Sequence, residues 1–115
     1  MNNILKQIIQ SCKLVQNEKY PFCYDPICAY EATGTMLSYN EEKNNVGIAE
    51  SISYTIDANI PILMFCGFTY YDLNKDNYNN IVNQIYDVIN QLRDTESSIK
   101  QHLVNEQLEL VKKDF

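Results

Sequence analysis

Residues 48–62 alternate between apolar and polar side chains, and this alternation constrains the fold more than any other feature of the chain. Side chains of a β-strand point to its two faces in turn, so the pattern predicts one strand with a buried face and an exposed face. At about 3.3 Å per residue, a straight strand of this length would span about 50 Å, and it would extend past its own core. One parity holds Ile48, Ile52, Tyr54, Ile56, Ala58, Ile60 and Ile62, and the other holds Ser51, Ser53, Thr55, Asp57 and Asn59.

Stretches with the helical spacing of apolar residues lie on either side of the predicted strands. The first covers residues 4–15, can be capped by Asn2 or Asn3, and ends before Pro21. The second follows Asp76 or Asn77 and carries an apolar stripe over residues 78–92. A third continues through residues 97–115, and the polar residues 94–98 leave open whether residues 77–113 form one helix or two.

The region between the first helix and the alternating strand predicts further strands. Residues 20–28 are aromatic and contain two prolines, which favours an edge strand because proline cannot donate to a sheet ladder. Residues 29–39 are expected to be extended with a bend at Gly34, and polar residues 40–45 connect them to residues 48–62 as a long hairpin. The predicted fold is a single α+β domain over residues 1–115. It has an antiparallel sheet with a long hairpin, and the N-terminal helix and one or two C-terminal helices pack on one face.

The charge balance argues against a nucleic-acid partner. The chain has a formal net charge of -6 and a single arginine, Arg93, whereas nucleic-acid binding requires a basic face. The sequence has no apolar run of membrane-spanning length and no secretory signal pattern at its N-terminus. We therefore expect no membrane partner, a cytoplasmic location in the producing cell, and reduced cysteines.

Two sets of residues have the chemistry of metal ligands. Residues 72–76 match the first half of a calcium loop, but Asn77 replaces the glycine and Asn83 replaces the bidentate acid, which favours a polar loop that caps the second helix. Cys12, Cys23, Cys28 and Cys66 with His102 lack the paired spacing of zinc ligands, which favours core thiols. We predict no catalytic residue, no metal, no cofactor and no small-molecule substrate.

Aromatic residues indicate either internal packing or a tyrosine-rich protein contact. Without basic residues among them they are a poor platform for nucleic-acid bases. The sequence leaves both interpretations open for Tyr20, Phe22, Tyr24, Tyr30, Tyr70 and Tyr71.

The order of helix, aromatic-proline run, long hairpin and helix resembles the small α+β tail-terminator and tail-completion (head–tail joining) proteins of tailed phages. The resemblance covers residues 1–92 and is carried by residues 4–15, Tyr20-Pro21-Phe22, residues 29–39 with 48–62, and residues 78–92. It implies a ring-forming joint protein, often hexameric, that ends tail-tube growth and docks to the head or neck. The family usually closes with a strand after the second helix, whereas residues 97–115 have helical spacing here.

These observations favour a non-enzymatic structural protein of a phage or prophage particle, which forms an oligomeric ring or joint. Its partners would be copies of itself and other proteins, in the cytoplasm or in the virion. The alternative is a small acidic protein-binding inhibitor, an anti-defence or immunity protein of a mobile element. The predicted interface residues are Ser53, Thr55, Asp57, Ile99, Leu103, Leu108 and Val111.

Overall fold

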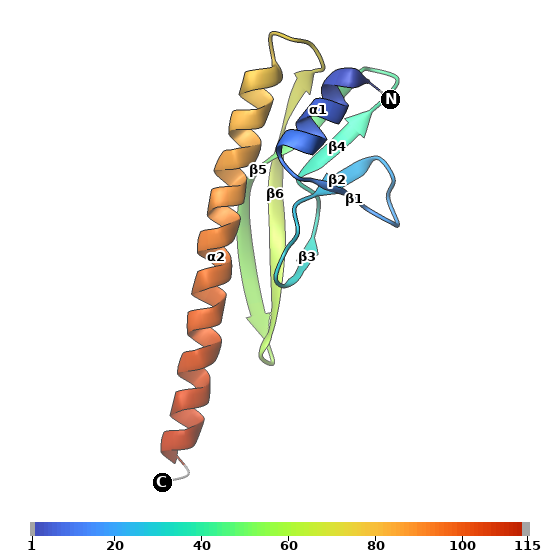
Figure 1. Ribbon diagram of the computed structural model, residues 1–115. Coiled ribbons are helices and arrows are strands. Elements are labelled where there is room, and N and C mark those ends of the chain that lie inside the picture. The colour runs from blue at the N-terminus through green and yellow to red at the C-terminus, as the bar shows by residue number, and fades with distance from the viewer. Residues whose placement is uncertain (1, 114–115) are drawn as a thin grey trace.

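A computed structural model describes residues 2–113, with side chains through residue 108. The chain forms an N-terminal helix, six strands in one sheet and a long C-terminal helix (Figure 1), so the predicted α+β class is confirmed. The molecule is elongated, with extents of 61 × 26 × 21 Å. The elements are α1 (Asn3–Ser11), β1 (Val15–Gln16), β2 (Cys23–Asp25), β3 (Glu31–Thr33), β4 (Leu37–Asn40), β5 (Asn45–Asp57), β6 (Ile60–Asp72) and α2 (Tyr78–Lys113).

Helix α1 begins where the sequence predicts and ends earlier. The Asn2 side chain accepts hydrogen bonds from the backbone N–H groups of Ile4 and Leu5, which satisfies two donors of the first turn. Lys13 has φ of 55°, a left-handed conformation that turns the chain out of the helix. Val15, predicted to be helical, therefore lies in β1 instead.

The sheet is mixed, which corrects the prediction of a purely antiparallel sheet. Its strand order is β1-β2-β4-β5-β6-β3, and every neighbouring pair is antiparallel except β3 with β6. The extended run predicted over residues 29–39 divides at Gly34, which has φ of 76°. Its first part, β3, runs parallel to β6, and its second part, β4, pairs with β5 as the predicted hairpin requires.

The long strand predicted over residues 48–62 is two strands. Strand β5 ends at Asp57, and Ala58 and Asn59, both with positive φ, form a two-residue turn that leads into β6. The turn matches the right-handed twist of the two strands because both of its residues are left-handed. The β5–β6 hairpin thus formed is the longest feature of the sheet, and its turn is called the hairpin tip below (Figure 1).

Helix α2 is a single helix of 36 residues, which answers the question of one helix or two. At 1.5 Å per residue it is about 54 Å long, and it runs along the hairpin and past its tip (Figure 1). Its apolar stripe packs on one face of the sheet in two clusters. The first cluster holds Leu5, Ile8, Cys12, Leu14, Tyr24, Met36, Leu37, Val46, Ile48, Ala49, Leu73, Ile81, Ile85 and Val88, and the second holds Leu63, Leu92 and Ile99.

Candidate functional site

The predicted interface residues of β5 lie on its exposed side. Ser53, Thr55 and Asp57 are all exposed, as the alternation predicts. Ile52 and Ile56 are half-buried against the second cluster, beneath α2. Over residues 51–57 the two parities of β5 therefore face the core and the solvent as expected, although Tyr54 on the core side keeps 39% of its surface exposed.

The predicted interface residues of α2 fall into two groups. Ile99 has no exposed surface, because it belongs to the second core cluster, and its prediction as an interface residue is wrong. Leu103 is half-buried against the same cluster. Leu108 remains 54% exposed, and Val104, which the sequence analysis did not single out, is 41% exposed. The Val111 side chain lies outside the described residues.

The C-terminal end of α2, residues 104–113, reaches beyond the sheet. Asn59 of the hairpin tip lines a hollow with Leu103, Glu106 and Gln107, which places the tip at this level of the helix. The last residues of α2, 109–113, extend past the tip with no strand alongside them (Figure 1). An isolated helical end gains little from its own hydrogen bonds, because helix stability in proteins comes mainly from packing.

A second surface lies on the side of the hairpin that faces away from α2, and we call it the outer face. By the cross-strand register it consists of a bulky row on β6 and a small row on β5. The bulky row is Ile62, Met64, Cys66, Phe68 and Tyr70, and the small row, directly opposite, is Thr55, Ser53, Ser51, Ala49 and Gly47, of which Ala49 and Gly47 are buried within the chain.

The two aromatic residues of the bulky row lean over β5 at the base of the hairpin. A Cβ atom added at Gly47 would lie 2.9 Å from Tyr70 Cε1 and 3.2 Å from Phe68 Cδ1, so a larger residue there would displace the Tyr70 ring. The two ring centroids are 6.2 Å apart, and Tyr70 is 69% exposed. The sequence leaves the role of Tyr70 open and gives no signal for Phe68, because no local pattern marks the turn that puts β6 beside β5.

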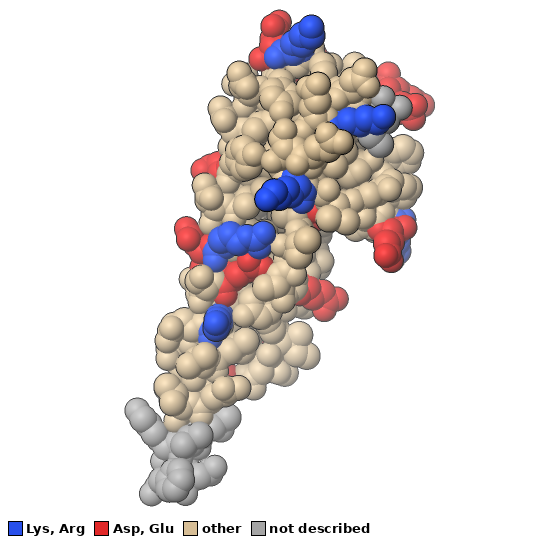
Figure 2. Space-filling model, viewed as in Figure 1, with Lys and Arg blue, Asp and Glu red and all other residues tan. Residues whose placement is uncertain are grey.

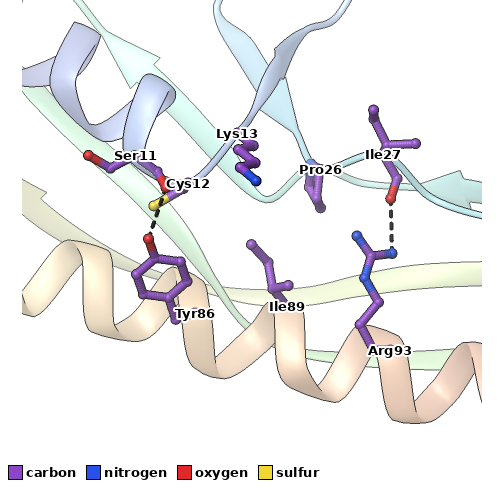
Figure 3. A pocket seen from close by; sticks show the side chains of 8 residues that line it. All are labelled: Ser11, Cys12, Lys13, Pro26, Ile27, Tyr86, Ile89 and Arg93. Atoms are coloured by element: carbon purple, nitrogen blue, oxygen red, sulfur yellow. Dashed lines mark hydrogen bonds between the residues drawn. The ribbon is translucent and has the colours of Figure 1, made fainter.

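A hollow of about 380 Å³ lies between α1, α2 and the loop before β3 (Figure 3). Tyr86 donates a hydrogen bond to the Ser11 carbonyl over 2.9 Å, and Arg93 donates to the Ile27 carbonyl over 3.0 Å. Burial raises the pKa of the Cys12 thiol to about 11, which keeps it neutral and a poor nucleophile. Nothing in this arrangement activates a nucleophile.

Arg93 and Glu96 tie the loop before β3 to α2. Arg93 Nη1 lies 2.7 Å from Glu96 Oε1, and the Ala29 N–H donates to Glu96 Oε2. The Arg93 guanidinium is therefore paired with the Glu96 carboxylate and the Ile27 carbonyl of the same chain. The hydrogen bonds of Tyr86 and Arg93 across this hollow join α1 and the loop before β3 to the middle of α2 (Figure 3).

The candidate metal ligands do not come together. Among residues 2–108, whose side chains the structure describes, no three His, Cys, Asp or Glu side chains are placed to hold a metal ion, and the four cysteines are free thiols. In the loop at residues 72–76, Asn77 donates to the Asp72 carbonyl and the Asn77 N–H donates to Asn74. These bonds shape the loop as the entry to α2.

Charged side chains do not form a single basic or acidic tract on the face shown in Figure 2. Basic and acidic groups are scattered there among uncharged residues. Within the described residues, no helix combines the length and apolar character needed to cross a membrane. Comparison with protein-family models, with curated proteins and with solved structures finds no match to this chain.

Proposed function

We propose that the protein is a non-enzymatic structural protein that works by self-association, as a joint or ring component of a phage or prophage particle. The observation that carries the self-association is the C-terminal end of α2. This end passes the hairpin tip, and Val104 and Leu108 remain largely exposed on it. A second chain that covers these side chains would remove apolar surface from water.

The phage assignment has a different support, the order of the elements. Helix α1, the aromatic run before β2, the strands and α2 follow one another as in the tail-terminator and tail-completion proteins that the sequence resembles. The chain departs from that pattern because a helix, and not a strand, follows residue 92. This end of α2 is therefore the part in which an assembly contact specific to this protein would lie.

The experiment compares the mass in solution of three forms of the full chain by light scattering over a range of concentrations. Leu108→Lys introduces a charge at an exposed apolar residue, and Gln107→Lys introduces the same side chain at its exposed polar neighbour. We expect the wild-type chain and Gln107→Lys to assemble beyond the 13.4 kDa monomer and Leu108→Lys to have a lower mass than either. Circular dichroism should be the same for all three.

A wild-type chain that stays monomeric at every concentration would contradict self-association and favour the inhibitor alternative. If the two lysine variants assemble equally, the C-terminal end of α2 is not part of the contact between chains. The phage assignment has its own test, which is mass spectrometry of particles purified from cells that express the chain. Absence of the chain from those particles would contradict it.

A further inference from the structure

The outer face of the hairpin has a ridge beside a groove. We call the bulky row of β6 the ridge, and we call the line of small side chains Ser51, Ser53 and Thr55 on β5, directly opposite, the groove. Nearer the base, the rings of Phe68 and Tyr70 already cover Gly47. Neighbouring strands lie about 4.8 Å apart, so the ridge and the groove are separated by one strand spacing.

The same rows carry no charge. Between Asp57 at the hairpin tip and Asp72 at the base, every residue of the bulky row and the small row is uncharged. The chain as a whole carries a net charge of -6, so most approaches between two copies bring like charges together. Within these two rows two copies meet without that repulsion, and the acidic residues of the outer face, Asp57, Asp72 and Glu31 of β3, lie at its margins.

We propose that a second copy of this chain packs its outer face on this one, about a two-fold axis that runs along the strands; this inference rests on the proposed self-association. This axis places β5 of one copy opposite β6 of the other, and corresponding strands of the two copies run in the same direction. The ridge of each copy then enters the groove of the other, and Met64 of one copy meets Ser53 of the other. The contact is the isologous kind, in which both copies use the same surface.

The fit of two such faces follows from sheet geometry. Two sheets with the same right-handed twist pack face to face about 10 Å apart, with their strands crossing at about 30°. In this arrangement α2 lies on the outside of each copy, and the aromatic pairs Phe68 and Tyr70 of the two copies come together at the base. Aromatic pairs contribute beyond the area that they bury.

The area is sufficient for a specific dimer at the low end of the usual range. A third strand flanks the hairpin at each end, β4 at the base and β3 near the tip. Strands β5 and β6 with 13 residues each, β4 with four and β3 with three cover roughly 500 Å² per copy, or about 1,000 Å² in total, at about 3.3 Å per residue and about 4.8 Å per strand. A specific interface needs at least about this area. A strongly basic partner would instead be drawn to the acidic remainder of the surface.

The first experiment introduces an arginine at a residue of the groove and, as a control, at an exposed residue outside the groove. Ser53 lies in the groove, and Ser97 is exposed on α2. We expect Ser53→Arg to raise the dimer dissociation constant at least about tenfold, whereas Ser97→Arg leaves it unchanged, as measured by sedimentation over a concentration series. Equal dissociation constants for the two variants would overturn the proposal.

A second measurement needs no change to the groove. Cys66 is half-buried on the outer face, where its thiol lies 3.5 Å from Ser53 Oγ. A short bismaleimide should therefore link two wild-type chains through Cys66, and the cross-linked dimer should disappear in Cys66→Ser. Persistence of that cross-link in Cys66→Ser, or its absence from an assembled wild-type sample, would refute the outer-face contact.

The two proposals fail in different ways. If the wild-type chain never exceeds the mass of a monomer, both self-association and the outer-face dimer are wrong. If the chain assembles while Ser53→Arg changes nothing and Leu108→Lys dissociates it, self-association stands and the outer-face dimer is wrong.

Discussion

Replacing Ile99 by alanine tests whether the second half of α2 belongs to the core of its own chain. Ile99 has no exposed surface and packs with Leu63 and Leu92 between the helix and the hairpin. Losing its carbons beyond Cβ removes about 0.8 kcal/mol of burial per carbon, and the cavity left behind adds to this loss. Alanine returns about 0.5 kcal/mol of helix propensity. We expect the free energy of unfolding to fall by about 3 kcal/mol.

Val104→Ala provides the matched control on the same helix. Val104 is 41% exposed, so its smaller loss of burial is largely offset by the better helix propensity of alanine. Urea denaturation followed by circular dichroism at low protein concentration measures both variants. We expect a change below about 0.5 kcal/mol for Val104→Ala. An equally small change for Ile99→Ala would refute the placement of α2 on the hairpin.

Three further predictions concern the strand register, the thiols and metal. Ile56→Asp, on the half-buried side of β5, should lose about 2 kcal/mol of stability. Ser53→Asp, on the exposed side, should lose less than about 0.5 kcal/mol. Equal urea midpoints for the two variants would contradict the strand register. Burial raises the pKa of Cys12 and of Cys28 from 9.0 to about 11, and Glu96 and Asp25 add to the shift at Cys28. Because the thiols ionise first in the unfolded chain, their contribution to the free energy of unfolding is complete below pH 9 and is lost between pH 9 and 11. A double variant, Cys12→Ser with Cys28→Ser, whose stability falls over this pH range as steeply as that of the wild-type chain would contradict this prediction. Excess EDTA should leave the melting temperature unchanged, and a drop restored by Ca²⁺ would show that the loop at residues 72–76 holds metal.

Local signals in the sequence were sufficient for much of the fold. Asn2 has a side chain that caps a helix, and the structure uses it in that way. The polar residues 40–45 form the turn between β4 and β5. Apolar residues at helical spacing in α1 and α2 are the residues that the core buries. Each of these features depends on neighbours in the chain, so a single sequence displays it.

The hairpin tip was missed because its turn residues give a weak signal. Two-residue turns of this kind favour Asn-Gly, and Ala58 is an unusual residue for a left-handed conformation. The apolar alternation also continues across the turn. After a two-residue turn the parity that faces the core changes, so Ile60 and Ile62 lie on the outer face instead of the core side.

The continuity of α2 and the direction of β3 depend on contacts between distant residues. The polar residues 94–98 do not break the helix, because Glu96 is held by Arg93 and by the Ala29 N–H, and Ile99 is buried one turn later. Strand β3 is three residues long and pairs with a strand far along the sequence. No local pattern distinguishes its parallel pairing from an antiparallel one.

The two-residue turn at Ala58 and Asn59 has a consequence for how the chain folds. A hairpin closed by so short a turn forms between residues close in sequence, so we expect β5 and β6 to pair before the rest of the sheet. The left-handed conformation of Ala58 costs about 1 kcal/mol, which slows this first step. Until β3 and β4 arrive, both edges of the ribbon are open to other chains. Aggregation during refolding should therefore compete most at this stage, and Ala58→Gly should reduce it.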